Sequence, residues 1–379
     1  MQFSLAEEQE MTRSVVREFA ESEVAPGAGK RDELEQFDRK LFDKMGKLGL
    51  TGIPVSERYG GAGGDWLTFS IAVEELARVC ASTAAALAAH TVYTAWPIYV
   101  YGDEYTKACY LSKLAGGTML GACALPLQSI DESNGASSIS AQSGKESWLL
   151  NGGHSYAVQA GIADVYLVFA HTDSNRRKNE YHTFLIERGA PGLRIGKSIH
   201  KLGLGSFPFS EIKLEQCSIP KKNQVGRNRQ GLTIASSLAD IAHISAAAQA
   251  VGIAQGAYEA AAAYAKERKQ FGSLIGKQQG ISFKLADMWT RLEAARLLTY
   301  QAAWRKDAGL DCGREAAIAR KFSAECAVAA VIEAIQVFGG YGYMQEYRLE
   351  RFLRDAKCLE SDLGTGGMNM DCLSRLLKK

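Results

Sequence analysis

The sequence has no long run of basic residues and almost no excess of charge of either sign. Lys and Arg together number 44 and Asp and Glu 42, which gives a formal net charge of +2. No five consecutive positions are all basic. The charge pattern therefore gives no reason to expect nucleic acid or an anionic membrane as a partner.

Signals for export and for membrane insertion are also missing. The N-terminal stretch MQFSLAEEQEMTRSVV has acidic residues where a signal peptide has a basic segment followed by an apolar one. No run of eighteen uncharged apolar residues occurs, so no transmembrane helix is predicted. We therefore expect a cytoplasmic protein that does not use a membrane.

Patterns that bind metals or form disulfides are absent as well. The eight cysteines are scattered without a CxxC pair, and the six histidines form no HxxxH pair. In a chain of this length, such spacing is typical of reduced thiols rather than of a disulfide framework or a zinc site. No metal is predicted.

The composition that is present is that of a globular protein with a large core. The 379 residues are 46% hydrophobic and 23% charged, and a chain of this length holds two or three domains. Apolar residues recur at three- and four-residue spacing in SLAEEQEMTRSVVREFAESEV and WLTFSIAVEELARVCASTAAALAAH. This spacing predicts an N-terminal helical domain over residues 1–120.

The pattern changes over residues 121–228. Short segments rich in β-branched and aromatic residues are separated there by Gly, Asn, Asp or Pro. They are SWLLNG, DVYLVFAHTD, EYHTFLIE, LRIGK and SEIKLEQCSIP. These segments predict a small middle domain of antiparallel strands.

Long helices are predicted again over residues 229–379. The clearest segment is LADIAHISAAAQAVGIAQGAYEAAAAYAKERKQFG, and it is rich in alanine, the residue with the highest helix propensity. The last helical segment ends at Gly339 and Gly340, as a helix with a glycine C-cap does. Small Ala and Gly faces favour closely packed helices, so a helical bundle and an α+β fold class are predicted.

Several stretches resemble the acyl-CoA dehydrogenase family, and they occur in the family's order along nearly the whole chain. They are ERYGGAGGDW, EELARVCAST, AVGIAQGAYEAAAAYAKERKQFG, QQGISFKLADM, QVFGGYGYMQEYRLERFLRDAK and the GT at 364–365. The resemblance implies an N-terminal helical domain, a middle β domain and a C-terminal four-helix bundle. It also implies a homotetrameric FAD oxidoreductase of fatty acid metabolism. Such an enzyme removes hydrogens from Cα and Cβ of an acyl thioester and passes electrons to an electron-transfer flavoprotein.

The positions that hold the nucleotide half of FAD match the family. A diphosphate calls for a guanidinium fork and for exposed backbone N–H groups. Arg268 in ERKQFG matches the family arginine that reaches the diphosphate of a neighbouring subunit's FAD. The resemblance assigns further cofactor positions to Gln270, Phe271, Gln279, Gln336, Gly339, Gly340 and Thr365.

The positions that hold the flavin ring depart from the family pattern. The family segment L-T-E-P-G-x-G-S-D corresponds to LPLQSIDES, in which Pro126 removes a hydroxyl and a backbone donor. Val158 replaces a threonine whose hydroxyl approaches the flavin N5 edge, whereas Tyr156 keeps an aromatic ring that can cover the flavin. The resemblance still assigns Leu125, Tyr156 and Val158 to the cofactor. We expect these changes to weaken ring binding and to alter the redox properties of the ring.

The catalytic base is the third departure. Removal of a thioester α-proton needs a carboxylate within hydrogen-bonding reach, but the family's glutamate position, framed by RDAK and GT, is Leu363. Some family members carry the glutamate on the long helix one residue before an arginine, and those positions are Ala242 and His243 here. We therefore take Asp362, beside the vacant position, as the displaced base.

Other polar groups near these positions remain alternatives. Glu360 and Asp240 are further carboxylates, and His243 is able to do acid–base chemistry. The resemblance assigns Glu132, Asp240 and His243 to substrate binding. The predicted substrate is an acyl thioester carried by CoA or by an acyl carrier protein.

Several functions are compatible with this pattern. The first is an acyl thioester dehydrogenase with a displaced base. The second is a catalytically impaired paralogue that supplies Arg268 to the FAD of a different partner chain. The third is a redox-neutral enzyme acting on an acyl thioester. A helical bundle built for protein interaction would explain the helices but not ERKQFG, QVFGG and the β segments together.

Overall fold

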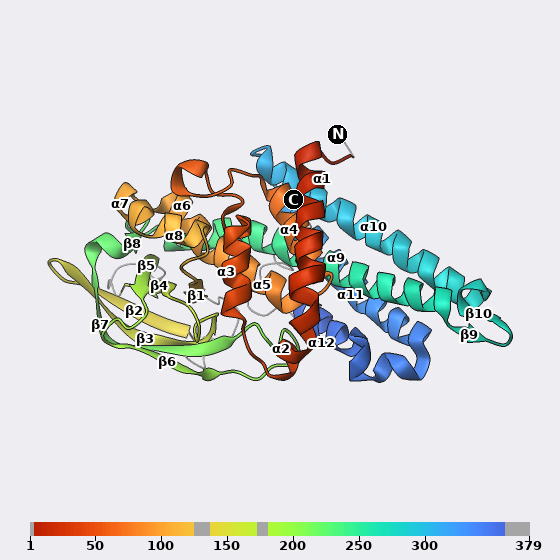
Figure 1. Cartoon of the computed structure of the whole chain (residues 1–379). Coiled ribbons are helices and arrows are strands. Elements are labelled where there is room, and N and C mark those ends of the chain that lie inside the picture. The colour runs from red at the N-terminus through yellow and green to blue at the C-terminus, as the bar shows by residue number, and fades with distance from the viewer. Residues whose placement is uncertain (1–3, 125–136, 173–180, 361–379) are drawn as a thin grey trace, which may run out of the picture.

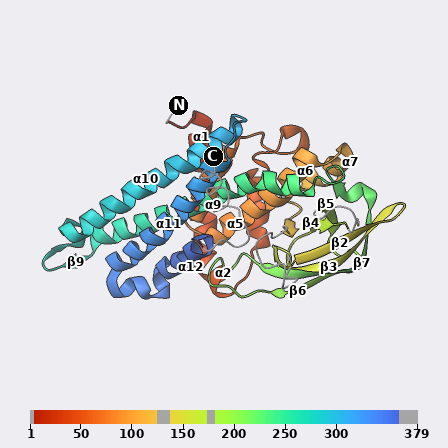
Figure 2. The same cartoon turned by 180° about the vertical axis from the view of Figure 1, so that it is seen from behind.

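The computed structural model describes residues 4–124, 137–172 and 181–360. Within them, a β-sheet lies at one end of the molecule and a bundle of long helices at the other, with the N-terminal helices packed between and over them (Figure 1). The view from behind shows the same arrangement, in which the long helix α9 (Gly231–Glu267) runs from the sheet to the far end of the bundle (Figure 2). The predicted α+β fold of an N-terminal helical, a middle β and a C-terminal helical domain is confirmed.

The N-terminal domain consists of short helices and connecting turns. Its α-helices are α1 (Glu7–Phe19), α2 (Ala28–Glu33), α3 (Arg39–Lys47), α4 (Trp66–Ala77), α5 (Ala81–His90), α6 (Trp96–Tyr101), α7 (Glu104–Thr106) and α8 (Ser112–Ala115). Asp residues begin three of them, because the carboxylates of Asp38, Asp65 and Asp103 accept hydrogen bonds from backbone N–H groups of the first turn. A π-helical segment at Thr91–Ala95 continues α5 toward the sheet.

The middle domain is a single sheet, to which the described residues contribute eight strands. In chain order they are β1 (Gly121–Ala124), β2 (Ser137–Ser143), β3 (Ser147–Val158), β4 (Val165–His171), β5 (Tyr181–Glu187), β6 (Leu193–Ser198), β7 (Phe209–Pro220) and β8 (Gln224–Val225). The strand order is β6-β7-β3-β1-β4-β5-β8, and β2 pairs with β3 and β4. The five segments predicted from the sequence fall on β3 to β7.

The sheet differs from the purely antiparallel prediction at β1. This strand pairs antiparallel with β3 but parallel with β4, from Gly121 opposite Val165 to Ala124 opposite Val168. Strand β2 also meets β4 in parallel at one pair of residues. A parallel neighbour requires a crossover connection, and the hairpin of β2 and β3 lies in the chain between β1 and β4.

The described part of the C-terminal domain, which ends at residue 360, contains four long helices. They are α9, α10 (Gln279–Asp307), α11 (Gly313–Phe338) and α12 (Leu349–Glu360). A two-residue hairpin, β9 (Lys269–Gln270) and β10 (Ser273–Leu274), joins α9 to α10 at the tip of the bundle, and a 3₁₀ segment at Gly339–Tyr343 follows α11. The first strand of the sheet thus begins at Gly121 and the first helix of the bundle at Gly231.

Helix α9 packs unusually close to α4, and two glycines make this possible. A Cβ atom on Gly252 would lie 2.3 Å from the Glu74 carbonyl oxygen, and one on Gly256 would lie 2.2 Å from the Arg78 carbonyl oxygen. No side chain fits at those distances, so only glycine allows this helix approach. The contact fixes α9, which carries much of the site described below, against the N-terminal domain.

Helices α9 and α11 are also long and apolar enough to cross a membrane by length and composition alone. Most of the apolar window of each is buried inside the protein, 78% for α9 and 56% for the helical stretch that begins α11. Core helices of a folded domain have this composition.

Candidate active site

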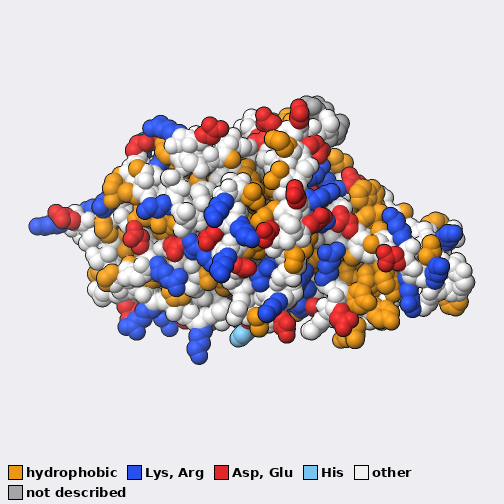
Figure 3. Space-filling view, viewed as in Figure 1, with side chains coloured by type: hydrophobic (Ala, Val, Ile, Leu, Met, Phe, Trp, Pro, Cys, Tyr) orange, Lys and Arg blue, Asp and Glu red, His pale blue; other side chains and the backbone are white. Residues whose placement is uncertain are grey.

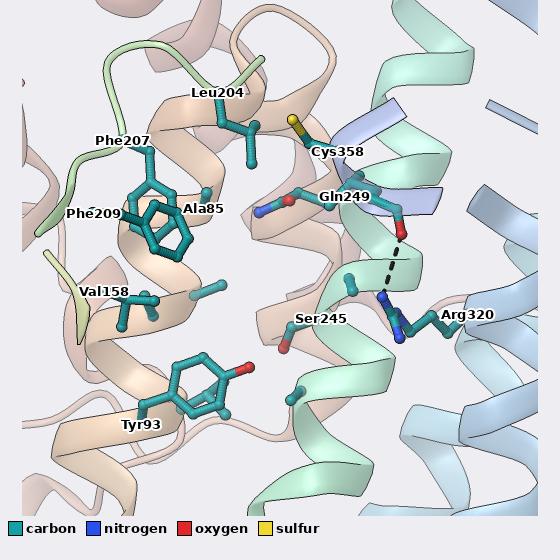
Figure 4. Close-up of a pocket in the computed structure, with 16 residues that line it drawn as sticks. Ala85, Tyr93, Val158, Leu204, Phe207, Phe209, Ser245, Gln249, Arg320 and Cys358 are labelled. Carbon is teal, nitrogen blue, oxygen red and sulfur yellow. Dashed lines mark hydrogen bonds between the residues drawn. The ribbon is translucent and has the colours of Figure 1, made fainter. Parts of the chain in front are cut away.

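A central cavity lies between the sheet, the N-terminal domain and the bundle. It has a volume of about 120 Å³ and is partly open to the outside. The 16 residues that line it come from α5 and the following turn, the end of β3, the 204–209 segment, α9, α11 and α12 (Figure 4). They are Ala85, Ala88, Ala89, Val92, Tyr93, Val158, Leu204, Phe207, Phe209, Ala242, Ser245, Ala246, Gln249, Arg320, Cys358 and Leu359.

Helix α9 supplies one wall of the central cavity. Ala242, Ser245, Ala246 and Gln249 follow one another at three- and four-residue spacing, which places them on one face of the helix. The two alanines leave space between the helix and the sheet. In Figure 4 the Ser245 hydroxyl and the Gln249 amide point from this face into the cavity.

The opposite wall is held in place by the sheet and by α12. Val158 ends β3, where it is paired with Cys123 of β1 and Phe209 of β7. The Leu204 backbone N–H donates to the buried Asp355 carboxylate of α12 over 2.6 Å. Burial raises the pKa of Asp355 to about 6 despite this hydrogen bond.

Arg320 of α11 is the charged side chain among the lining residues. It is buried, and its Nη2 atom donates to the Leu359 carbonyl oxygen at 3.3 Å. No lining residue in the described part of the chain is a carboxylate. The central cavity is therefore an apolar space with polar groups at a few points and a positive charge in its wall, which favours a ligand with negative or partly negative atoms.

A second hollow, which we call the end groove, lies at the tip of the bundle. It has a volume of about 440 Å³ and is formed by the ends of α9, α10 and α11. Its lining consists of Tyr264, Arg268, Gln270, Ile275, Gln278, Ile281, Gln336, Val337, Phe338, Gly339, Gly340, Tyr341 and Met344. The Arg268 guanidinium stacks over the Tyr341 ring, with its carbon 5.8 Å from the ring centroid.

The two glycines of the end groove expose their backbone. Gly339 has φ of +61°, a conformation that side chains rarely adopt, and no atom lies within 4 Å of the position of a Cβ on either Gly339 or Gly340. A ligand is thus able to approach this backbone closely. Together with the Arg268 guanidinium, the end groove has the donors that a diphosphate needs.

The structure brings five residues assigned to the cofactor together in the end groove. They are Arg268, Gln270, Gln336, Gly339 and Gly340. Phe271 lies beyond it at the hairpin turn and is 94% exposed, and Gln279 is exposed at the start of α10.

Two further cofactor assignments fall on β3. Val158 lines the central cavity, so this position contributes apolar contact where the family pattern has a hydroxyl. Tyr156 is 46% exposed in the single chain.

Asp240 and His243 do not line the central cavity. The Asp240 carboxylate lies on another face of α9, 3.9 Å from the Cys312 sulfur and close to Gly313. Burial raises the pKa of Asp240 above its ordinary value. His243 is buried in the protein interior. Neither placement favours the role in substrate binding that the resemblance assigns.

Other predicted residues lie outside the described residues. These are Leu125, Glu132, Asp362 and Thr365, together with Pro126 and the vacant base position Leu363. Leu359, the last lining residue of α12, precedes Asp362 by three positions in the sequence.

Sequence reasoning missed four polar residues of the central cavity: Tyr93, Ser245, Gln249 and Arg320. They come from three helical segments, the π-helical segment after α5, α9 and α11, and share no local motif. The signal that was available is the spacing of Ala242, Ser245, Ala246 and Gln249, which predicts one face of a helix. Two of the missed residues belong to that face.

Among the residues that the structure describes, no group of three or more His, Cys, Asp or Glu side chains is arranged to hold a metal ion.

Comparison with known proteins identifies the family. The acyl-CoA dehydrogenase N-terminal domain matches residues 6–118, the middle domain residues 129–217 and the C-terminal domain residues 229–377. A short-chain specific acyl-CoA dehydrogenase of Clostridium acetobutylicum is 42% identical over 365 residues, which are 96% of each chain.

Solved structures give the same result. A chain in a structure titled for the electron transferring flavoprotein of Acidaminococcus fermentans superposes with a TM-score of 0.95, at 40% identity over 100% of this chain and 99% of that one. The prolyl acyl carrier protein oxidase AnaB has a TM-score of 0.92, at 31% identity over 99% and 100% of the two chains. Family domains along the whole chain, a relative at 42% identity and matching folds place this protein in the acyl-CoA dehydrogenase family.

Proposed function

We propose that this protein is an FAD-dependent dehydrogenase that oxidises the Cα–Cβ bond of a short acyl thioester. The central cavity is the observation that carries the proposal. An apolar cavity of about 150 Å³ is enough for benzene, and the central cavity, at about 120 Å³, suits an acyl group of few carbons. The specificity of the Clostridium relative for short chains supports the same size class.

The residues of the end groove fit the nucleotide half of FAD. Arg268 supplies a guanidinium for the diphosphate, and Gly339 and Gly340 allow the cofactor to approach the backbone. Bound FAD supplies the acceptor for the hydride that leaves Cβ. At the central cavity, Val158 contributes an apolar wall for the ring in place of a hydroxyl donor.

The two hollows belong to different FAD molecules. Gln249 and Arg268 are nineteen positions apart on α9, which at 1.5 Å per residue is about 28 Å. This separation is compatible with an end groove that serves the FAD of a neighbouring copy, as the family resemblance implies for Arg268. It thereby supports the homotetramer that the resemblance implies.

Exposed apolar side chains on the bundle support such an assembly. Hydrophobic atoms gather on the bundle side of the molecule (Figure 3). Large apolar side chains exposed on α10 and α11 are Phe283, Trp289, Leu297, Trp304, Phe322 and Ile332. Patches of this kind mark protein interfaces.

Proton removal from Cα needs a base that the described lining residues do not provide. We assign this role to Asp362, which follows the lining residue Leu359 by three positions. Loss of the proton places negative charge on the thioester carbonyl oxygen. The buried Arg320 guanidinium in the cavity wall favours that charge electrostatically.

The thioester carrier is CoA or an acyl carrier protein, and the electron acceptor is an electron-transfer flavoprotein. The prolyl acyl carrier protein oxidase AnaB shares the fold, and so does the chain from the electron transferring flavoprotein structure. Both partners are therefore compatible with this architecture.

The proposal is tested by the visible spectrum of the purified protein and by anaerobic addition of butyryl-CoA. We expect stoichiometric FAD, bleaching of the flavin by the thioester, and loss of bleaching in Asp362→Asn. Glu360→Gln is the control, because Glu360 pairs with Lys357 on the surface of α12. A protein that stays colourless with added FAD overturns the proposal, and normal bleaching in Asp362→Asn overturns the choice of base.

A further inference from the structure

Ser245 has a buried hydroxyl without a partner among the described residues. The residue is 4% exposed, and its Oγ atom makes no hydrogen bond to any residue that the structure describes. It points into the central cavity (Figure 4). An unpaired buried hydroxyl is costly and rare in folded proteins, so each case requires an explanation.

The same protein shows what a serine on a helix ordinarily does. Several helical hydroxyls donate to the carbonyl oxygen four residues earlier, at distances of 2.7 to 3.0 Å. They are Ser14, Ser22, Ser70, Thr290 and Thr299. Ser245 has the Ile241 carbonyl at the same spacing but does not bond to it. Its hydroxyl instead faces the space where the acyl group is proposed to lie.

Gln249 provides a second polar group on the same face. It follows Ser245 by one helical turn, is 4% exposed, and directs its amide into the central cavity. The surrounding wall is apolar, with Ala85, Phe207 and Phe209 among its members. A purely aliphatic acyl group would leave the Ser245 hydroxyl buried without a partner.

We propose that the central cavity selects a short acyl group that carries an oxygen substituent beyond Cβ, held by the Ser245 hydroxyl and the Gln249 amide. This inference rests on the proposed function, because it names the acyl class for that site. A serine hydroxyl both donates and accepts, as does a glutamine amide, so together they match a hydroxyl or carboxylate oxygen. The buried Arg320 in the wall disfavours a cationic substituent.

The substituent is placed beyond Cβ because dehydrogenation of a bond whose carbon carries a hydroxyl would give an enol, which rearranges to a ketone instead of remaining an enoyl thioester. A four-carbon acyl group with oxygen on its fourth carbon satisfies this condition and the size of the central cavity. A site built to hydrogen-bond a substrate oxygen rejects the analogue that lacks it, because its own polar groups are then left unpaired.

The test uses the FAD-loaded protein and thioethers of CoA, which lack the carbonyl needed for dehydrogenation. Binding of S-(4-hydroxybutyl)-CoA, S-(3-carboxypropyl)-CoA and S-butyl-CoA is measured by isothermal titration calorimetry. We expect at least one oxygen-bearing thioether to bind about tenfold more tightly than S-butyl-CoA, as one buried hydrogen bond implies. The two oxygen-bearing ligands distinguish a hydroxyl from a carboxylate.

Substitutions on α9 test whether Ser245 and Gln249 cause the preference for oxygen-bearing thioethers. In Ser245→Ala, the ratio between oxygen-bearing and plain thioether is expected to fall to about threefold or less. Ser237→Ala is the matched control on the same helix, because the Ser237 hydroxyl already donates to the Ile234 carbonyl oxygen at 2.7 Å. We expect the ratio in this control to equal that of the unaltered protein. Gln249→Met, which keeps the side-chain length, is expected to lower the ratio as Ser245→Ala does.

Failure of this inference is distinguishable from failure of the proposed function. Binding of all three thioethers with equal affinity, or a preference unchanged in Ser245→Ala, overturns this inference and leaves the proposed function standing. Absence of binding by every thioether also overturns this inference, whereas the proposed function is overturned by a protein that stays colourless with added FAD.

Discussion

The Nε atom of Arg296 donates to the Oε1 atom of Glu74 over 2.9 Å in the interior of the protein. This ion pair joins α10 of the bundle to α4 of the N-terminal domain. Glu74 also accepts from the Tyr300 hydroxyl at 2.7 Å, and Arg296 donates to Gln255 of α9. Burial lowers the pKa of Arg296, but the neighbouring Glu74 and Tyr300 raise it above its ordinary value.

Arg296→Met is expected to destabilise the fold, because it leaves the buried Glu74 carboxylate without its cation. Loss of one partner of a buried pair costs about 3 kcal/mol or more. The free energy of unfolding in urea measures this loss. Arg291→Met on the same helix is the control, since Arg291 pairs with Asp287 on the surface and is expected to cost less than about 1 kcal/mol. Equal losses in the two variants would contradict the prediction.

The buried His90 is expected to make the free energy of unfolding fall in mildly acid solution. Its Nδ1 atom accepts from the Gly121 backbone N–H and its Nε2 atom faces the Leu114 carbonyl oxygen, both at 3.0 Å, so the neutral ring joins α5 to β1 and α8. Burial is the main cause that lowers the pKa of His90 to about 4. The hydrogen bond with the Leu114 carbonyl opposes this shift, the cation Arg39 lowers the pKa further, and Asp164 has a smaller raising effect.

The unfolded chain binds a proton to this histidine near pH 6.5, before the folded protein does. The stabilisation is therefore complete above about pH 6.5 and is lost as the pH falls toward 4, by an amount on the order of 1 to 3 kcal/mol. Unfolding free energies at pH 7.5 and 5.0 measure it. His90→Gln is expected to show a smaller difference between these pH values, whereas the exposed His200→Gln is expected to keep it. An unchanged difference in His90→Gln would rule out His90 as the cause.

Arg268→Ala is expected to lower the affinity for FAD about 10- to 100-fold, because hydrogen bonds to charged groups contribute about 1.5 to 3 kcal/mol each. The variant should purify with less flavin, and titration of the apoprotein with FAD gives the affinity. Lys269→Ala is the control, since Lys269 is exposed on the same hairpin and does not line the end groove. If both variants bind FAD alike, Arg268 does not hold the diphosphate.

Gly256→Ala tests the contact between α9 and α4. The added Cβ would lie 2.2 Å from the Arg78 carbonyl oxygen, and overpacking of this kind costs about 1 to 3 kcal/mol. Gly280→Ala is the matched substitution in open space near the start of α10, where alanine is expected to stabilise by up to about 1 kcal/mol. Thermal unfolding of the two variants should therefore shift in opposite directions. A higher melting temperature for Gly256→Ala would refute the close contact.

The sequence was sufficient for the fold class and for β3 to β7, because β-branched and aromatic residues mark those strands. It was insufficient for β1 and β2, whose sequences GACA and SSISAQS consist mainly of small residues with low strand propensity. The partners of β1 on either side, rather than its own residues, make it a strand. Its parallel pairing with β4 has no local signal.

The end groove was predictable because the residues that form it belong to short, continuous sequence motifs. ERKQFG and QVFGG both contribute to the end groove, where Arg268 meets Gly339 and Gly340. The central cavity was not predictable in this way, because residues from α5, α9, α11 and α12 meet there only in the folded protein. Asp240 illustrates the limit: a small rotation about the α9 axis decides whether a side chain faces the cavity or the Cys312 side of the bundle.

Helix α9 fixes both the distance and the relative orientation of the central cavity and the end groove. Its face at Ser245 and Gln249 lines the central cavity, and Arg268, directly after its last residue, lines the end groove. Each residue of an α-helix adds about 1.5 Å and turns the chain by about 100°. Insertion or deletion of a single residue between Gln249 and Arg268 would therefore rotate Arg268 by about 100° about the helix axis, away from the end groove. The central cavity would be unchanged. The length of this stretch of α9 is therefore constrained separately from the identities of its residues, among which Gly252 and Gly256 are fixed by the contact with α4.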